Sequence, residues 1–228
     1  FGAGSLPVDG GPAAAVGLLG LTFGHGQILA LVLCWIGIAL LVTSWLALGP
    51  RAVSRRLPTR DAVWATVLWS LPLLPSVPLF STDAWTYLSQ GAMANAGISP
   101  YDHGAVANPG PFTDEVWQDW RTTTAPYGPL HIVLMQLVVA LSGQEPTTGI
   151  VLLRVLILVA LAGLVALVIA AARRTGTDPG AAVWMACASP LTVIHLVGGL
   201  HNEIFPLLAC VAAVVLAMDK RAVGAGAA

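Results

Sequence analysis

The chain has 228 residues, of which 57% are hydrophobic and 9% are charged, and its formal net charge is −1 at pH 7. A soluble domain carries roughly a quarter of its residues as charged side chains, so this composition excludes an ordinary water-soluble fold and indicates lipid as the main solvent. The near-neutral charge also excludes the basic face that nucleic-acid binding requires.

Apolar runs along the chain predict membrane-spanning helices. An uncharged run covers residues 27–48. A second run covers 61–79, where three prolines would kink or unwind the far end. Each run is close to the roughly 20 residues that cross a bilayer core. Three further spans are predicted toward the C-terminus, at 150–172, 180–198 and 203–218.

The apolar segment 129–142 is short for a span, because at 1.5 Å per residue it reaches only about 21 Å of a core about 30 Å thick. If it does not cross, eight of the ten basic residues fall on one side of the membrane. If it crosses, the split is five and five. The positive-inside rule therefore predicts that it lies in, or re-enters, the outer interface. The eight residues are Arg51, Arg55, Arg56, Arg60, Arg173, Arg174, Lys220 and Arg221.

These spans predict an all-α polytopic membrane protein with one long extracytoplasmic loop that contains interfacial helices. Neither end of the chain resembles a natural boundary, so we expect a fragment of a longer protein. The predicted order is an extracytoplasmic segment 1–26, two transmembrane helices with a basic cytoplasmic loop in 27–79, an extracytoplasmic catalytic loop 80–149, three transmembrane helices in 150–218, and a cytoplasmic end 219–228.

The start of the long loop carries an acid at the membrane surface. Ser81 or Thr82 would cap a helix that runs to about Ala96 and that Gly97 would end. Asp83 then lies in the first turn of that helix, where the second span emerges. An acid at that depth costs energy unless it is used or paired, but a carboxylate there also stabilises a helix start. Position alone leaves both interpretations open.

Other side chains on the predicted outer side allow two interpretations each. Aromatic residues such as Tyr87 and Tyr127 could stack on a sugar, but interfacial aromatics also anchor to lipid headgroups. His201-Asn202-Glu203 place three polar side chains at a tight turn between apolar helices, which favours function. Other polar residues of this side are interpreted without a functional role. The acids Asp102, Asp114, Glu115 and Asp119 are interpreted as solvated loop charges, and His25, His103 and His131 as structural or interfacial residues.

The stretches that carry a family resemblance are Phe80-Ser81-Thr82-Asp83 with Tyr87 and Gln90-Gly91, Pro100-Tyr101, Ala125-Pro126-Tyr127-Gly128-Pro129-Leu130, and His195-Leu196-Val197-Gly198-Gly199 with His201-Asn202. In this order and spacing they resemble the GT-C superfamily of polyprenol-phosphate-sugar glycosyltransferases. The closer resemblance is to the actinobacterial polyprenol-phosphomannose-dependent α-1,6-mannosyltransferases that build lipomannan cores. It covers roughly residues 27–218, and no single stretch is specific by itself.

The resemblance implies a GT-C-type bundle in the plasma membrane, with its active site on the extracytoplasmic face. The family's catalytic acid lies at the start of the first large outer loop, which is the place of Asp83. Arg154 is placed like a basic residue near the lipid phosphate. The family has an aspartate after His-Asn, whereas this chain has Glu203, a carboxylate with a longer arm. The implied substrate-binding residues are Trp85, Tyr87, Tyr101, Tyr127, Arg154, His201, Asn202 and Glu203.

The implied reaction moves mannose from a β-linked polyprenyl phosphate to a mannan or lipomannan acceptor, with inversion. Asp83 would act as the general base, and Arg154 would hold the phosphate. No cofactor is predicted. Asp83, His201 and Glu203 could meet on the outer face around a divalent metal, but no ligand spacing demands one.

Three other functions stay open at this point. A related transferase could use another polyprenyl-phosphate sugar, such as arabinofuranose. A transporter or lipid flippase would use Asp83 and Glu203 as relay acids, although such a protein is expected to place charges in the middle of its spans. A non-catalytic assembly subunit is the third alternative, and the intact pattern around Asp83 counts against it.

Overall fold

The structure is a computed structural model that describes residue 17 and residues 19–219. Most of the predicted outer segment 1–26, and the basic residues Lys220 and Arg221, therefore lie outside the described residues. Every element within the described part of the chain is helical, in agreement with the all-α prediction. Two helices there, α2 (Gly24–Val53) and α7 (Pro146–Thr175), are long and apolar enough to cross a membrane.

The chain folds as two compact units, and both α2 and α7 contribute to each of them. The first unit contains the described residues up to Val32 together with Pro75–Val155. The second contains Leu33–Leu74 and the described residues from Leu156 onward. Each unit is described below by itself.

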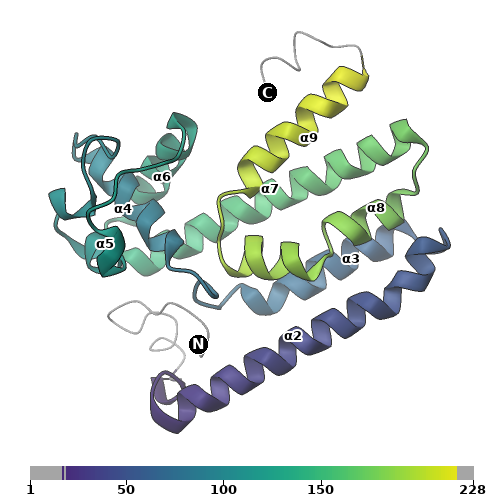
Figure 1. Cartoon of the computed structure of the whole chain (residues 1–228), viewed down its shortest axis with the longest axis horizontal. Coiled ribbons are helices and arrows are strands. Elements are labelled where there is room, and N and C mark those ends of the chain that lie inside the picture. Colours follow the sequence, from purple (N-terminus) through teal and green to yellow (C-terminus); the bar gives the residue numbers. More distant parts are fainter. Residues whose placement is uncertain (1–16, 18, 220–228) are drawn as a thin grey trace. The chain divides into compact units, whose positions relative to one another are not determined.

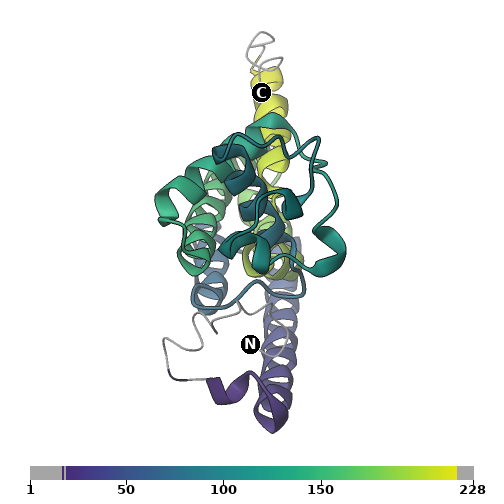
Figure 2. The same ribbon diagram turned by 90° about the vertical axis from the view of Figure 1, so that its left-hand side faces the viewer.

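The first unit is built on a close crossing of α4 (Asp83–Asn95) with α6 (Pro129–Ser142). Gly91 makes this approach possible, because a β-carbon added there would lie 2.5 Å from the backbone carbonyl of Met135. Asn95 continues the contact, since its side-chain amide donates to the carbonyl of Gln136 at 3.0 Å. Figure 1 labels both helices, and Figure 2 turns this part of the chain, in teal, toward the viewer.

The stretch between α4 and α6 is an ordered structure that folds back on itself. It contains η3 (Ala105–Ala107), α5 (Pro111–Asp114) and η4 (Gln118–Trp120). The Arg121 guanidinium ties it together by donating to the carbonyls of Val116 at 2.9 Å and Asp114 at 2.8 Å. The predicted long loop is therefore a folded lobe that can hold side chains in fixed positions.

The second unit pairs α3 (Thr59–Ser70) with α8 (Pro179–Ala186), which Figure 1 shows side by side. The Asp178 carboxylate caps α8 by accepting from the amide of Ala181 at 2.8 Å, with Pro179 at the first helical position. Gly180 allows this helix start to touch the carbonyl of Leu57, where a β-carbon would clash at 2.0 Å. These local signals explain why the helix begins at residue 179.

One predicted helix differs from the one observed, and a second is interrupted where its prolines predict. The continuous helix predicted over 180–198 is wrong, because α8 ends at Ala186 and the chain turns before a π-helix, η5 (Thr192–Gly198). The chain becomes helical again at Pro190. Proline suits this first position because it has no N–H to donate to a preceding helical turn. Run 61–79 is helical only to Ser70, followed by the 3-10 turn η2 (Leu71–Leu73), which confirms the predicted unwinding.

Other boundaries agree with the sequence. The short apolar helix predicted at 129–142 is α6, with the same ends. The last predicted run, 203–218, is α9 (Ile204–Met218). The predicted run 150–172 lies within α7, whose start at Pro146 is earlier because Glu145 accepts hydrogen bonds from the first free amides of the helix, including that of Thr147 at 3.0 Å.

A reciprocal tryptophan pair joins α2 to α8 within the second unit. The Trp45 and Trp184 rings stack with centroids 4.6 Å apart. Each indole N–H donates to the other residue's backbone carbonyl, both at 3.0 Å. The pair therefore satisfies two indole donors and two carbonyls at once.

Replacing Trp184 with Phe should lower the free energy of unfolding by about 0.5–1.5 kcal/mol, since it keeps an aromatic ring but removes one hydrogen bond. Thermal unfolding of the detergent-solubilised protein measures this loss. The matched control is Trp64→Phe, because Trp64 is 55% exposed. Equal effects of the two substitutions would contradict a role for the pair.

Candidate active site

Asp83 lies where the sequence predicts, in the first turn of α4. The chain enters this helix through Phe80, whose φ of +59° is unusual for a bulky residue. The Ser81 hydroxyl accepts a hydrogen bond from the Asp83 amide at 3.1 Å, so a serine side chain supports the helix start. The Asp83 side chain is half-buried. Strained backbone of this kind costs about 1–3 kcal/mol and is concentrated at functional sites.

A cluster of three rings stands one turn further along α4. Tyr87 meets Tyr127 edge to face at 5.2 Å between centroids, and meets His131 of α6 in the same way at 5.0 Å. Tyr127 and His131 complete the triangle at 4.6 Å. Because Asp83 and Tyr87 are four residues apart on one helix, their side chains share a face. Asp83 therefore lies one helical turn before Tyr87, on the face of α4 that carries this ring cluster. The three rings come from three segments of the chain.

His131 is the buried member of this cluster, with 8% of its surface exposed. Burial removes water from the imidazolium and lowers the pKa of His131 from 6.5 to about 4. The ring is therefore neutral at physiological pH. It packs against Tyr127 as an uncharged ring.

This burial predicts a pH dependence of stability. The unfolded chain takes up the His131 proton near pH 6.5 and the folded chain only near pH 4, so the free energy of unfolding should fall as pH drops through that window. Thermal unfolding between pH 7.5 and 4 should show a smaller fall for His131→Phe than for the wild type. His103→Phe, which removes an exposed histidine, is the matched control. A His131→Phe slope equal to the wild-type slope would contradict the assignment.

Two stretches singled out in the sequence lie next to each other in the first unit. The Ala125 amide donates to the carbonyl of Pro100 at 2.7 Å, which brings Pro100-Tyr101 beside Ala125-Pro126-Tyr127. Tyr101 is 45% exposed and can contact a ligand. Trp85 is 1% exposed and packs in the core of the unit, so a substrate contact for it stays a prediction.

Gln90 adds an unexplained polar group to this face of α4. It follows Asp83 by seven residues and therefore lies on the same face, two turns on. The side chain is 4% exposed, and its Oε1 has no hydrogen-bond partner among the described residues. A buried acceptor left unsatisfied costs about 1–3 kcal/mol, so such a group points to an additional donor, such as a ligand hydroxyl.

Arg154 links α7 to the segment before α4. Its side chain is 3% exposed, and its guanidinium donates to the carbonyl of Ser76. Both residues belong to the first unit. This contact holds the approach to Asp83 in place, and the predicted contact of Arg154 with a lipid phosphate stays a prediction.

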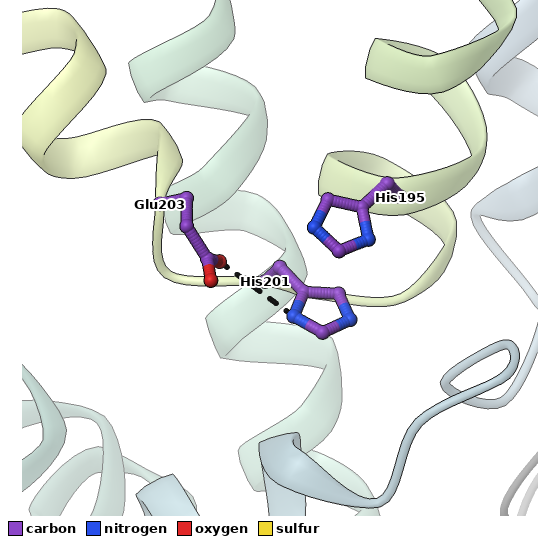
Figure 3. A group of neighbouring side chains, drawn as sticks. All are labelled: His195, His201 and Glu203. Carbon is purple, nitrogen blue, oxygen red and sulfur yellow. Dashed lines mark ion pairs between the residues drawn. The ribbon is translucent and has the colours of Figure 1, made fainter.

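In the second unit the turn between η5 and α9 gathers His195, His201 and Glu203 (Figure 3). The two imidazoles stack with centroids 3.8 Å apart and planes 19° from parallel. His201 Nδ1 lies 3.6 Å from Glu203 Oε2. Asn202, between them in sequence, is buried. The predicted group of His201 and Glu203 is thus brought together within this unit, whereas a metal site that adds Asp83 combines both units and stays a prediction.

The backbone of this turn is specialised for the histidine contact. Gly199 leaves room for the His201 ring, because a β-carbon there would lie 2.6 Å from His201 Cδ2. Leu200 adopts a φ of +58°, and a π-helix immediately precedes the turn. Both features are uncommon and often mark functional sites.

The contacts of two members of these groups were not predicted from the sequence. His131, predicted to be structural or interfacial, meets Tyr87 across a helix crossing, a contact that sequence spacing does not show. His195 was noted within a motif but given no role. Its signal was available, because His195 and His201 flank the Gly198-Gly199 pair that reverses the chain.

The chain matches the sequence profile of the family described as alpha-(1→6)-mannopyranosyltransferase, N-terminal domain, over residues 1–228. It is 37% identical to alpha-(1→6)-mannopyranosyltransferase A of Corynebacterium glutamicum, in an alignment that covers 97% of this chain and 47% of that protein. It is also 37% identical to the protein of the same name from Mycobacterium tuberculosis, over 97% of this chain and 43% of that protein. A probable alpha-(1→6)-mannopyranosyltransferase of Mycolicibacterium smegmatis is 34% identical over 89% of this chain and 37% of its own length.

The chain spans less than half the length of these relatives. No solved structure matches it. The family match covers the whole chain and agrees with the resemblance carried by the stretches around Asp83 and His201. The chain therefore belongs to the alpha-(1→6)-mannopyranosyltransferase family, as a match to its N-terminal domain.

Proposed function

We propose that the protein containing this chain is a multi-pass plasma-membrane enzyme that transfers mannose from polyprenyl-phosphate-mannose to an α-1,6-mannan or lipomannan acceptor on the extracytoplasmic face. Membership of the family and the names of its relatives support mannosyl transfer. The two long apolar helices support a membrane location. The observation that carries the proposal is Asp83, half-buried in the first turn of α4, on the helix face that Tyr87 shares.

Asp83 acts as the general base in this proposal. Inversion at the sugar needs one in-line displacement, in which the acceptor oxygen attacks the anomeric carbon and the lipid phosphate leaves with the bonding electrons. The phosphate leaves without protonation, so one base suffices. Asp83 takes the proton of the acceptor hydroxyl, and such catalysis typically contributes about 10²–10⁴-fold.

The ring cluster and its neighbours border the sugar. Tyr127 is half-buried and held against Tyr87 and His131, so its exposed part offers a fixed edge for the pyranose. Tyr101 lies on the adjacent segment and is more exposed. Gln90 Oε1 provides an acceptor for a sugar hydroxyl on the Asp83 face. Trp85 supports the site from within the core.

In the first unit, Arg154 is proposed to bind the lipid phosphate. In the second unit, His201, Asn202 and Glu203 are proposed as further substrate-binding residues. Arg154 supplies a buried cation, and a guanidinium can bind two phosphate oxygens at once. In the second unit an apolar cavity of about 380 Å³ lies between α3 and α7, lined by side chains that include Val67, Leu74 and Leu158. Its apolar walls suit part of a polyprenyl chain.

The test uses membrane vesicles that contain the full-length parent protein, supplied with synthetic polyprenyl-phosphate-mannose and a short α-1,6-mannoside. The expected result is a mannoside longer by one α-1,6-linked mannose. In one control reaction polyprenyl-phosphate-arabinofuranose replaces the mannose donor. In a second control reaction the mannoside acceptor is omitted. Transfer of arabinose alone would overturn the choice of sugar. No transfer from either donor, with movement of the lipid across the vesicle membrane, would favour a flippase instead.

A further inference from the structure

We propose that His195, His201 and Glu203 bind a divalent transition-metal ion with the coordination preferences of zinc. The proposal concerns the turn between η5 and α9, and it does not depend on the transferase activity. One ligand atom from each side chain lies within 4.8 Å of the others. Figure 3 shows the Glu203 carboxylate and one edge of each imidazole facing the same space.

The donor set is one that zinc uses. Two imidazole nitrogens and one carboxylate oxygen form the three-ligand sites in which zinc keeps a fourth position open. Bonds of about 2.0–2.2 Å in a tetrahedral arrangement place donor atoms about 3.3 Å apart. His201 Nδ1 and Glu203 Oε2, at 3.6 Å, are already near that separation. The widest separation, 4.8 Å, requires a movement of about 1.5 Å, within reach of a side-chain rotation.

The stacked rings show which side chain must move. An imidazole lone pair lies in the plane of its ring, so two rings only 19° from parallel cannot both point at one ion. His201 is the fixed ligand, because its ring rests against Gly199 and its side chain is 12% exposed. His195 is exposed and can turn out of the stack at little cost. Metal binding should therefore rotate His195 toward the His201–Glu203 pair.

A simple ion pair does not account for this arrangement. Glu203 has 59% of its side chain exposed, and exposed pairs contribute only about 0–1 kcal/mol. So small a contribution does not explain why a second histidine lies against the pair, or why Leu200 in the same turn adopts a φ of +58°. A bound ion accounts for the three side chains together. The open fourth position would accept water or an anionic oxygen such as that of a phosphate.

The experiment is a Co²⁺ titration of the full-length protein, purified without a histidine tag and stripped with a chelator. Tetrahedral Co²⁺ absorbs visible light, and Zn²⁺ added afterwards should displace it. His195→Ala and His201→Ala should each weaken Co²⁺ binding by at least about 10-fold, since even residues behind the ligands change metal affinity by that much. Glu203→Gln should do the same while keeping the shape of the side chain.

Two controls make the outcome decisive. His103→Ala removes an exposed histidine of the other unit and should leave Co²⁺ binding unchanged. Asp83→Asn should also keep Co²⁺ binding whether or not it transfers mannose, which separates this proposal from the transferase proposal. Absence of Co²⁺ binding by folded wild-type protein overturns the proposal. Binding that all three ligand variants keep at wild-type strength overturns it equally.

Discussion

Asp83→Asn should lower kcat for mannosyl transfer by about 10²–10⁴-fold, with a much smaller effect on KM. The amide keeps the size of the side chain but cannot accept the acceptor's proton. The hydrogen bond that the backbone N–H of residue 83 donates to Ser81 Oγ does not involve the substituted side chain, so α4 should still begin at the same residue. Initial rates in vesicles that contain equal amounts of full-length wild-type and variant protein measure the effect.

The matched control for this substitution is Asp102→Asn, which removes an exposed acid from the same lobe. It should retain the wild-type rate within about twofold, because a solvated surface charge contributes little to a buried reaction site. If Asp83→Asn folds and transfers mannose at the rate of the Asp102→Asn protein, Asp83 is not the base.

Gly91→Ala should reduce transfer by about 100-fold and lower the free energy of unfolding by about 1–3 kcal/mol. The added β-carbon would lie 2.5 Å from the carbonyl of Met135, and a backbone atom cannot rotate away. Helix α4 would have to move off α6, which separates Tyr87 from His131. A displacement of about 1 Å at a reacting group is enough to cost two orders of magnitude in rate.

Gly37→Ala is the control for this second change, because Gly37 is also inside a helix and a β-carbon there meets nothing within 4 Å. It should leave the melting temperature unchanged or slightly raised, since alanine favours helix more than glycine does. Both variants are compared by thermal unfolding and by initial rate. A Gly91→Ala protein as stable and active as Gly37→Ala would show that the helix crossing does not position the site.

Much of the helical layout follows from local signals. The ends of α6 are predicted because Pro129 can begin a helix and Gly143, at a φ of +65°, can end one. The start of α4 follows from Ser81, whose hydroxyl accepts from the Asp83 amide, and its end from Gly97. Hydropathy failed for 180–198, because it measures apolar content and not the hydrogen-bond pattern. The break after Ala186 and the π-helix beyond it leave the apolar content of the run unchanged.

The candidate site was predictable only where it depends on neighbours in sequence. Asp83 and Tyr87 are one helical turn apart, and His201 and Glu203 occupy one turn of chain, so spacing alone places each pair. The contact of Tyr87 with His131 requires the α4–α6 crossing, and that crossing depends on a single glycine, Gly91. The burial of Trp85 and Arg154 likewise depends on how the first unit packs.

The central claim is that one displacement, with Asp83 as its base, moves the sugar. The measurement that tests it most directly supplies the full-length protein with two polyprenyl-phosphate-mannose donors that differ only in anomeric configuration. The product linkage is then read by NMR. Consumption of the β-linked donor alone, with an α-linked product that Asp83→Asn fails to form, is the predicted result. An α-linked product made from the α-linked donor would mean retention of configuration, which a single in-line displacement cannot give, and would contradict the account.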